Sequence, residues 1–225
     1  MIKLFWNTHN LKKTITNDED IKKEEVVEFK WGLYHKRHSD IWIYEILKKI
    51  EYKTIDNAEN LKKGDIVIIV DSNPEKKIEF YNALKLVCSK IFLFHLGDEF
   101  GTYNVSPVYD NCNYIWRSFC SNKYFKNSKV TCIPLGYKSG VLNRQNGKNR
   151  KYKWSFIGTP HKSSRHDLLF QFSDIKPFFC HKTQEFDKKI ISTEEMSEAL
   201  SLTEFMPCPA GFNHPDSYRL YEALE

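Results

Sequence analysis

The sequence contains no long hydrophobic run, although 41% of its 225 residues are apolar and 15% are aromatic. That composition is typical of a globular protein and excludes a disordered chain. No stretch approaches the roughly 20 apolar residues that a membrane-spanning helix needs. The opening residues, MIKLFWNTHN, also lack the apolar core of a secretory signal peptide. We therefore expect a soluble, unexported chain with no membrane span.

Cysteine patterns that bind metals are absent as well. The six cysteines form no C-x-x-C and no Cys/His cluster at zinc spacing, which excludes the common zinc modules. Several lie in apolar runs such as LKLVCSKIF and PFFCHK, where a free thiol behaves as a small buried hydrophobe. We expect most of them to be reduced core residues, which favours a reducing compartment.

The chain has no arginine-rich stripe. Its net charge of +5 is spread over lysines that occur even in acidic neighbourhoods such as NDEDIKKEE. This pattern favours a solvated lysine surface over a nucleic-acid patch, so no nucleic acid partner is expected. The densest basic stretch, RQNGKNRKYK at 144–153, is interpreted as part of an exposed linker.

Short apolar runs alternate with helical periodicity along the chain, which predicts an α/β fold with mainly parallel strands. We expect two α/β halves, 1–143 and 153–225, joined by a linker at 144–152. Strands are expected at 2–6, 64–70, 90–100, 129–140, 153–158, 177–181 and 203–209, and helices at 39–50, 73–90, 163–172, 194–201 and near the end of the chain. The core faces predicted for the first two helices are Ile43, Ile46, Leu47 and Ile50, and Ile78, Tyr81, Leu84 and Val87.

One candidate site follows the strand that ends at Gly158. The phrase FIGTPHKSSRHDLL places small and hydroxyl residues, Lys162 and Arg165 at the start of a helix. Unpaired N–H groups and the positive end of the helix dipole favour an anion there, and phosphate is the obvious one. The alternative is that Ser163 or Ser164 merely caps the helix, whose Leu168, Leu169 and Phe172 face the core.

A second candidate site lies in CPAGFNHPDSYRLYEALE at the end of the sequence. Asp216, Arg219 and Glu222 share one face of the predicted helix. An arginine there suits a diphosphate, and a carboxylate one turn later suits the hydroxyls of a ribose. The alternative is an exposed ion pair of little energetic value. The opposite, apolar face of this helix would carry Leu220, Ala223 and Leu224.

The phrases HLGDEF, IPLGYKSG, FIGTPHKSSRHDLL and TEFMPCPAGFNHPDSYRLYEALE occur in this order over residues 90–225. In this they resemble the exostosin-type glycosyltransferases and their relatives of the ribitol xylosyltransferase type. The resemblance implies a GT-B architecture of two Rossmann-like halves, with the acceptor on the N-terminal half and the nucleotide sugar on the C-terminal half. It further implies inverting transfer from a nucleotide sugar such as a UDP-sugar to a glycan or glycoprotein, with no metal or other cofactor.

The resemblance also implies roles for particular residues. Arg165 and Arg219 would meet the diphosphate and Glu222 the ribose, with contacts from Lys162, Ser163, Ser164 and Ser217. An inverting transfer needs a base, for which His95, Asp98 and Glu99 at a strand exit are the candidates. Asp98 or Glu99 is preferred, and the alternative is that GDE forms a turn with surface acids. Arg117 and Lys138 are expected near the same site.

In one respect the sequence departs from the family. Members continue after the helix that holds Glu222 with a glycine and a further apolar strand, whereas this sequence stops at Glu225. We therefore expect a truncated chain whose C-terminal half is incomplete and whose activity is uncertain. The alternative function is a non-catalytic nucleotide-sugar-binding module of the same fold. Cytoplasmic residence is favoured over the Golgi lumen, in which relatives reside.

Overall fold

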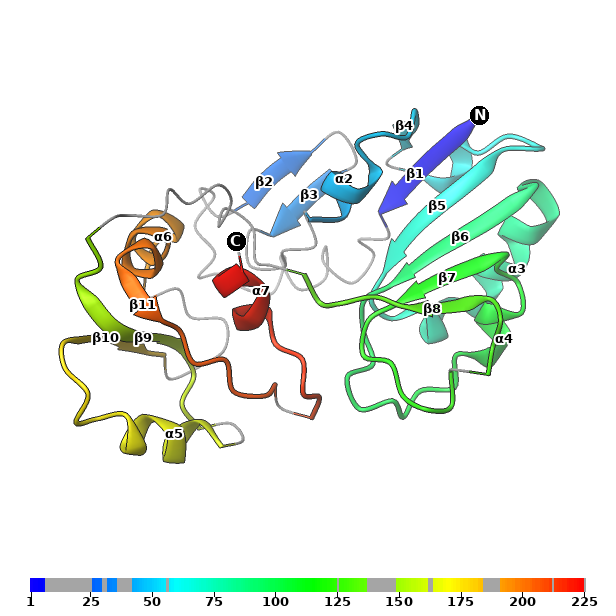
Figure 1. The fold of residues 1–225 in the computed structure, drawn as a ribbon. Coiled ribbons are helices and arrows are strands. Elements are labelled where there is room, and N and C mark those ends of the chain that lie inside the picture. Colours follow the sequence, from blue (N-terminus) through cyan, green and yellow to red (C-terminus); the bar gives the residue numbers. More distant parts are fainter. Residues whose placement is uncertain are drawn as a thin grey trace. The chain divides into compact units, whose positions relative to one another are not determined.

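The structure is a computed structural model of the 225-residue chain. It describes residues 1–6, 26–29, 32–35, 42–55, 57–124, 126–136, 149–161, 164–183, 191–211 and 213–224. The chain divides into two compact units, which are described separately here (Figure 1). Unit 1 comprises 1–38 and 44–134, and unit 2 comprises 39–43 and 135–225. Most of the linker expected at 144–152 lies outside the described residues.

Unit 1 is built on a six-stranded parallel sheet in the order β4-β1-β5-β6-β7-β8. Its strands are β1 (Ile2–Trp6), β4 (Lys53–Ile55), β5 (Ile66–Asp71), β6 (Lys90–His95), β7 (Tyr114–Arg117) and β8 (Val130–Cys132). Central strand β5 is β-branched and almost wholly buried, as parallel strands covered on both faces require. The predicted α/β class with parallel strands is confirmed. A separate antiparallel pair, β2 (Val26–Phe29) and β3 (Gly32–His35), was not anticipated.

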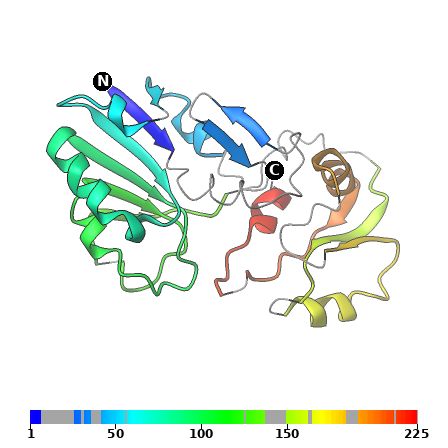
Figure 2. The same ribbon diagram turned by 180° about the vertical axis from the view of Figure 1, so that it is seen from behind.

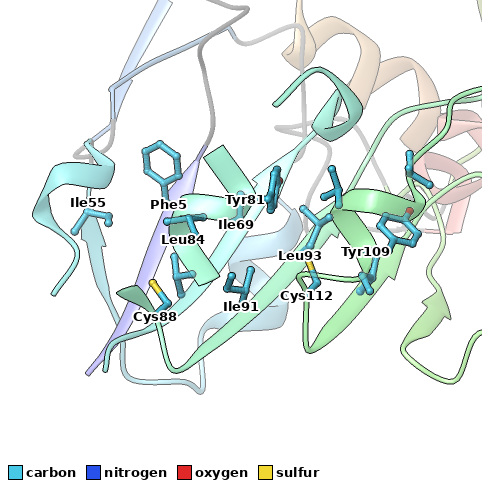
Figure 3. Packing of buried hydrophobic residues seen from close by; sticks show 14 of the residues in the cluster. Phe5, Ile55, Ile69, Tyr81, Leu84, Cys88, Ile91, Leu93, Tyr109 and Cys112 are labelled. Atoms are coloured by element: carbon cyan, nitrogen blue, oxygen red, sulfur yellow. The ribbon is translucent and has the colours of Figure 1, made fainter. Parts of the chain in front are cut away.

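Helices cover one face of this sheet and form its main core. They are η2 (Ala58–Asn60), η3 (Pro74–Lys77), α3 (Ile78–Val87) and α4 (Ser106–Tyr109). Tyr81 and Leu84 of α3 are buried in a cluster with Ile91 and other residues of the sheet (Figure 3), and Figure 2 shows the helices on this face from behind. The core face predicted for α3 is confirmed except at Val87, which is 36% exposed because the helix ends there.

The helix expected at 39–50 ends three residues earlier than predicted, and residues 39–41 lie outside the described residues. Helix α2 covers Trp42–Leu47, and Ile43 and Leu47, one turn apart, are buried. Ile46 and Ile50 were assigned to the same face but are exposed. Ile50 lies beyond the end of the helix, so helical spacing no longer fixes the direction of its side chain.

Unit 2 contains a three-stranded parallel sheet in the order β10-β9-β11, with a helix against each face. Its elements are β9 (Tyr152–Gly158), α5 (Arg165–Gln171), β10 (Phe178–Lys182), α6 (Thr193–Ser201), β11 (Thr203–Phe205) and α7 (Tyr218–Leu224). On one face, Leu169 of α5 is buried with Trp154 and Phe156 of β9. On the other, Ala199 and Leu200 of α6 are buried with Ile157. The core face predicted for α5 is confirmed, because Leu168 and Phe172 pack against the first cluster.

The expectation that most of the cysteines are reduced holds for four of the six, and one pair is oxidised. Cys120 and Cys132 form a disulfide, with 5.7 Å between their Cα atoms. It joins the segment after β7 to the end of β8. Adjacent parallel strands bring these two positions close, although the sequence around either cysteine shows no cysteine spacing motif. Cys88, Cys112, Cys180 and Cys208 are free. Within the described ranges, no helix is long and apolar enough to cross a membrane.

Candidate functional site

Two arginines predicted to bind a ligand lie in unit 2 near the carboxyl end of central strand β9. Arg219, on α7, is 8% exposed. Its Nε and Nη2 both donate to the carbonyl oxygen of Ile157, at 3.2 and 2.7 Å, and its guanidinium lies 4.5 Å from the ring centre of Phe156. Helix α7 is thereby fixed to the strand exit through a charged side chain.

Arg165 is the first residue of α5 and is also buried. Its Nη1 donates to the carbonyl of Thr159 at 3.1 Å and its Nη2 to the carbonyl of Ala210 at 3.2 Å. These two carbonyls lie after β9 and before α7. Arg165 therefore connects the two loops that were predicted to hold the donor.

The charges of this cluster influence one another. Burial and then the nearby positive charge of Arg165 together lower the pKa of Arg219 to about 10, although the charge of Glu222 acts in the opposite direction. Arg219 still carries its charge at neutral pH. Glu222 is 6% exposed, so two guanidinium groups and one carboxylate share a buried region at the end of β9. Such a region favours an anion, because the main-chain carbonyls that accept from the arginines do not neutralise positive charge.

The remaining predicted donor residues have different outcomes. Ser217 is buried just before α7, and among the described residues its hydroxyl has no hydrogen-bond partner. Ser164 is the N-cap of α5, but its side chain makes no capping bond, so the alternative prediction of a capping serine is wrong at this position. Lys162 and Ser163 lie outside the described residues.

Helix α7 has the opposite orientation to the one its amphipathic pattern predicts. Arg219 and Glu222 are buried, whereas Leu220 is 40% and Leu224 is 76% exposed. The predicted apolar face is therefore the exposed one. The polar face turns inward because Arg219 finds partners there: it donates to the Ile157 carbonyl and lies over the Phe156 ring.

Asp216, the third residue of the predicted polar face, has a structural role. One carboxylate oxygen accepts from the Leu135 N–H at 3.2 Å, and the other accepts from the Tyr221 hydroxyl at 2.7 Å. Burial, followed by this hydrogen bond and the charge of Asp216, raises the pKa of Tyr221 above its ordinary value. Asp216 therefore fixes α7 to the segment that begins at residue 135.

In unit 1, three strands end in register with a charged or titratable residue. Asp71, His95 and Arg117 are the last residues of β5, β6 and β7 and are paired across the sheet. The carboxyl ends of parallel strands are the usual place for ligands in open α/β sheets. The Asp71 carboxylate is occupied by Lys77 Nζ at 2.7 Å and by the Tyr81 hydroxyl at 3.0 Å.

Asp98, a predicted base, forms a fully buried ion pair with Arg117, with 2.7 Å between Oδ2 and Nη2. Its other carboxylate oxygen accepts the N–H groups of Thr102 and Tyr103 at 2.8 and 3.2 Å. The backbone of Asp98 is left-handed, with φ of 63°, and Asp tolerates this conformation better than most residues do. Both oxygens are engaged in holding the loop together, so an acceptor hydroxyl would have to displace one of these bonds.

His95 is enclosed in the same network. Its Nδ1 lies 2.7 Å from the Tyr109 hydroxyl and 2.8 Å from Arg117 Nη1. Burial, and then the charge of Arg117, lowers its pKa well below the ordinary value, so the ring is neutral at physiological pH. The third predicted base, Glu99, is partly exposed in the loop after β6. The arrangement thus brings His95 and Asp98 together through Arg117, a residue that was predicted only to lie nearby; Lys138 lies outside the described residues.

Sequence reasoning missed two acidic residues at or just after the carboxyl end of β5. Asp71 closes the run IVIIVD, and a charged residue that ends a buried strand was the available signal. Glu75 follows in η3. Both of its carboxylate oxygens are buried with no hydrogen-bond partner in the described part of the chain, and burial raises its pKa.

Comparison with protein families, with curated proteins and with solved structures finds no match to this chain. Within the ranges that the structure describes, no group of three or more His, Cys, Asp or Glu side chains could hold a metal ion. The functional argument therefore depends on the two clusters themselves.

Proposed function

We propose that the chain is an inverting glycosyltransferase of GT-B type, which takes the sugar of a nucleotide donor such as a UDP-sugar and transfers it to a glycan or glycoprotein. In this proposal unit 2 binds the donor and unit 1 the acceptor. The observation that carries the proposal is the buried group of Arg165, Arg219 and Glu222 at the carboxyl end of β9. Open parallel α/β sheets bind nucleotides at the carboxyl ends of their strands.

Each group has a role in the proposed reaction. The positive charges of Arg165 and Arg219 stabilise the negative charge that develops on the departing diphosphate. The Glu222 carboxylate accepts hydrogen bonds from the two ribose hydroxyls. Glu99 is the proposed base, because it is partly exposed in the loop after β6, whereas Asp98 and His95 are buried. It would take the proton of the acceptor hydroxyl as that oxygen attacks the sugar carbon and the nucleoside diphosphate leaves.

A second candidate function is a nucleotide-sugar-binding module without turnover. The burial of Asp98 and His95 favours it, since two of the three residues expected to supply a base are held by other groups. The two candidates differ in whether bound donor is consumed.

The test is binding of UDP and release of UDP from a panel of UDP-sugars with glycan acceptors. Glu222→Gln should weaken UDP binding by about tenfold, because the amide keeps the shape but loses the charge-assisted hydrogen bonds to ribose. Asp167→Asn, at an exposed carboxylate of α5, is the control and should bind as the unmodified chain does. Binding without release favours the module, and the absence of both binding and release overturns the proposal.

A further inference from the structure

The last residue of β9, Gly158, makes room for the guanidinium of Arg219. Its φ is 138°, and a Cβ built at this position would lie 2.2 Å from Arg219 Nη2 and 3.4 Å from its Cζ. No real Cβ approaches a nitrogen that closely, so a side chain at residue 158 and the observed guanidinium exclude each other.

In this position, the hydrogen-bond donor atoms of Arg219 are not all used in the same way. Nε and Nη2 are used on the Ile157 carbonyl. Among the described residues no hydrogen bond involves Nη1, and Nη1 is not one of the fully buried unsatisfied atoms. Arg165 differs, since both of its terminal nitrogens donate to main-chain carbonyls.

We infer that Gly158 is a positioning residue: by leaving its Cβ space to Arg219, it lets that guanidinium clamp the Ile157 carbonyl with Nε and Nη2 and present Nη1 to an anionic ligand. The inference rests on the proposed function for the identity of the ligand, a diphosphate ester. Arg219 is then the ligand contact, and Arg165 holds the loops. Lysine cannot replace Arg219, because one ammonium group cannot grip the carbonyl in this two-donor way and still present a fixed third donor.

The first test needs no ligand. Urea unfolding midpoints of the full chain are compared for Gly158→Ala, Arg219→Ala and the double variant. The midpoint shift caused by Gly158→Ala should be smaller in the Arg219→Ala background, because the added methyl then meets no guanidinium, while any backbone strain at φ 138° is the same in both. Gly64→Ala is the control, since Gly64 has φ of 88° with no atom within 4 Å of its Cβ position. Its shift should be equal in the two backgrounds, and equal shifts for Gly158→Ala would overturn the inference.

A second measurement applies even where Gly158→Ala fails to fold. In the unmodified chain the Arg219 Nε–H, identified by its loss in Arg219→Lys, should exchange slowly with solvent because it is buried and bonded to Ile157. Rapid exchange overturns the clamp.

Inorganic pyrophosphate then tests the ligand contact by calorimetry. Gly158→Ala and Arg219→Lys should each weaken its binding by about tenfold. Unchanged affinity in both variants overturns the inference. If the unmodified chain binds no pyrophosphate, the presentation of Nη1 to an anion and the proposed function both fail, and the unfolding comparison still decides whether Gly158 positions Arg219.

Discussion

Single residues in unit 1 hold charges that water does not reach. Arg117 and Asp98 have side chains with 0% exposure and lie 2.7 Å apart, and the ring of Tyr124 lies 4.1 Å from the Arg117 guanidinium carbon. Removing one member of such a pair leaves the other buried without its counter-charge, which is far more costly than losing an exposed pair.

Asp98→Asn should therefore destabilise the chain by about 3 to 5 kcal/mol, the range for breaking a buried ion pair. Asparagine keeps the size of the side chain and tolerates the left-handed backbone at this position, so the loss reports the charge. Urea unfolding measures it. The matched control is Glu204→Gln, whose partner Lys153 lies in an exposed pair and whose cost should stay below about 1 kcal/mol. Equal costs would contradict the buried ion pair.

His95 predicts a dependence of stability on pH. Its pKa in the folded chain lies well below 6.5, so below pH 6.5 the unfolded chain binds a proton that the folded chain does not. Stability must then fall as pH decreases from 7 to 5, by up to about 1.4 kcal/mol per pH unit for one proton. His95→Gln should flatten this dependence in unfolding experiments, whereas His166→Gln, at an exposed histidine, should not. If stability varies with pH in the same way in both variants, His95 is not the source of the pH dependence.

At the level of elements, the strands were the most predictable part of the chain. Continuous β-branched runs such as IVIIV can be recognised without tertiary information, because a strand buried on both faces has no polar alternation. Strand β7, Tyr114–Arg117, was missed because it has only four residues, too few to show a clear alternation of buried and exposed positions, and because an arginine is usually exposed. The orientation of α7 could not be predicted, because the apolar pattern places Leu220 and Leu224 inside, whereas Arg219 is held inside by the Ile157 carbonyl, which lies far away in the sequence. Arg165, Arg219 and Glu222 were nevertheless identified as site candidates, since they stand out in short stretches of the sequence.

Helix α6 has the clearest local start signal. The Ser192 side chain accepts the Glu195 N–H at 3.0 Å, and the Glu195 carboxylate accepts the Ser192 N–H at 2.8 Å. Ser192→Ala should cost about 1 kcal/mol, since it leaves an N–H group of the first turn without its acceptor. Urea unfolding measures this, with Ser128→Ala, at an exposed serine outside any helix, as the control. No difference between the two would contradict the capping box.

For the molecule as a whole, the disulfide predicts how many thiols can be alkylated before and after reduction. Four of the six cysteines are free, so iodoacetamide in urea should add four groups without reductant and six after reduction, as read by intact mass. Cys120→Ser with Cys132→Ser should lower the stability by about 3 kcal/mol, because a closed loop of this size restricts the unfolded chain. Six additions without reductant would show that the two thiols are not joined.

Unit 2 is assembled from two stretches that are distant in the chain, and one close approach shows why. Gly136 has φ of 71°, and a Cβ there would lie 2.5 Å from the indole of Trp42, which belongs with residues 39–43 to this unit. A recombinant fragment that starts at residue 135 would therefore lack the tryptophan against which its own first residues are shaped. A study of unit 2 alone should therefore include residues 39–43, by fusion or as a separate peptide, and can use the indole fluorescence to see whether this segment has bound.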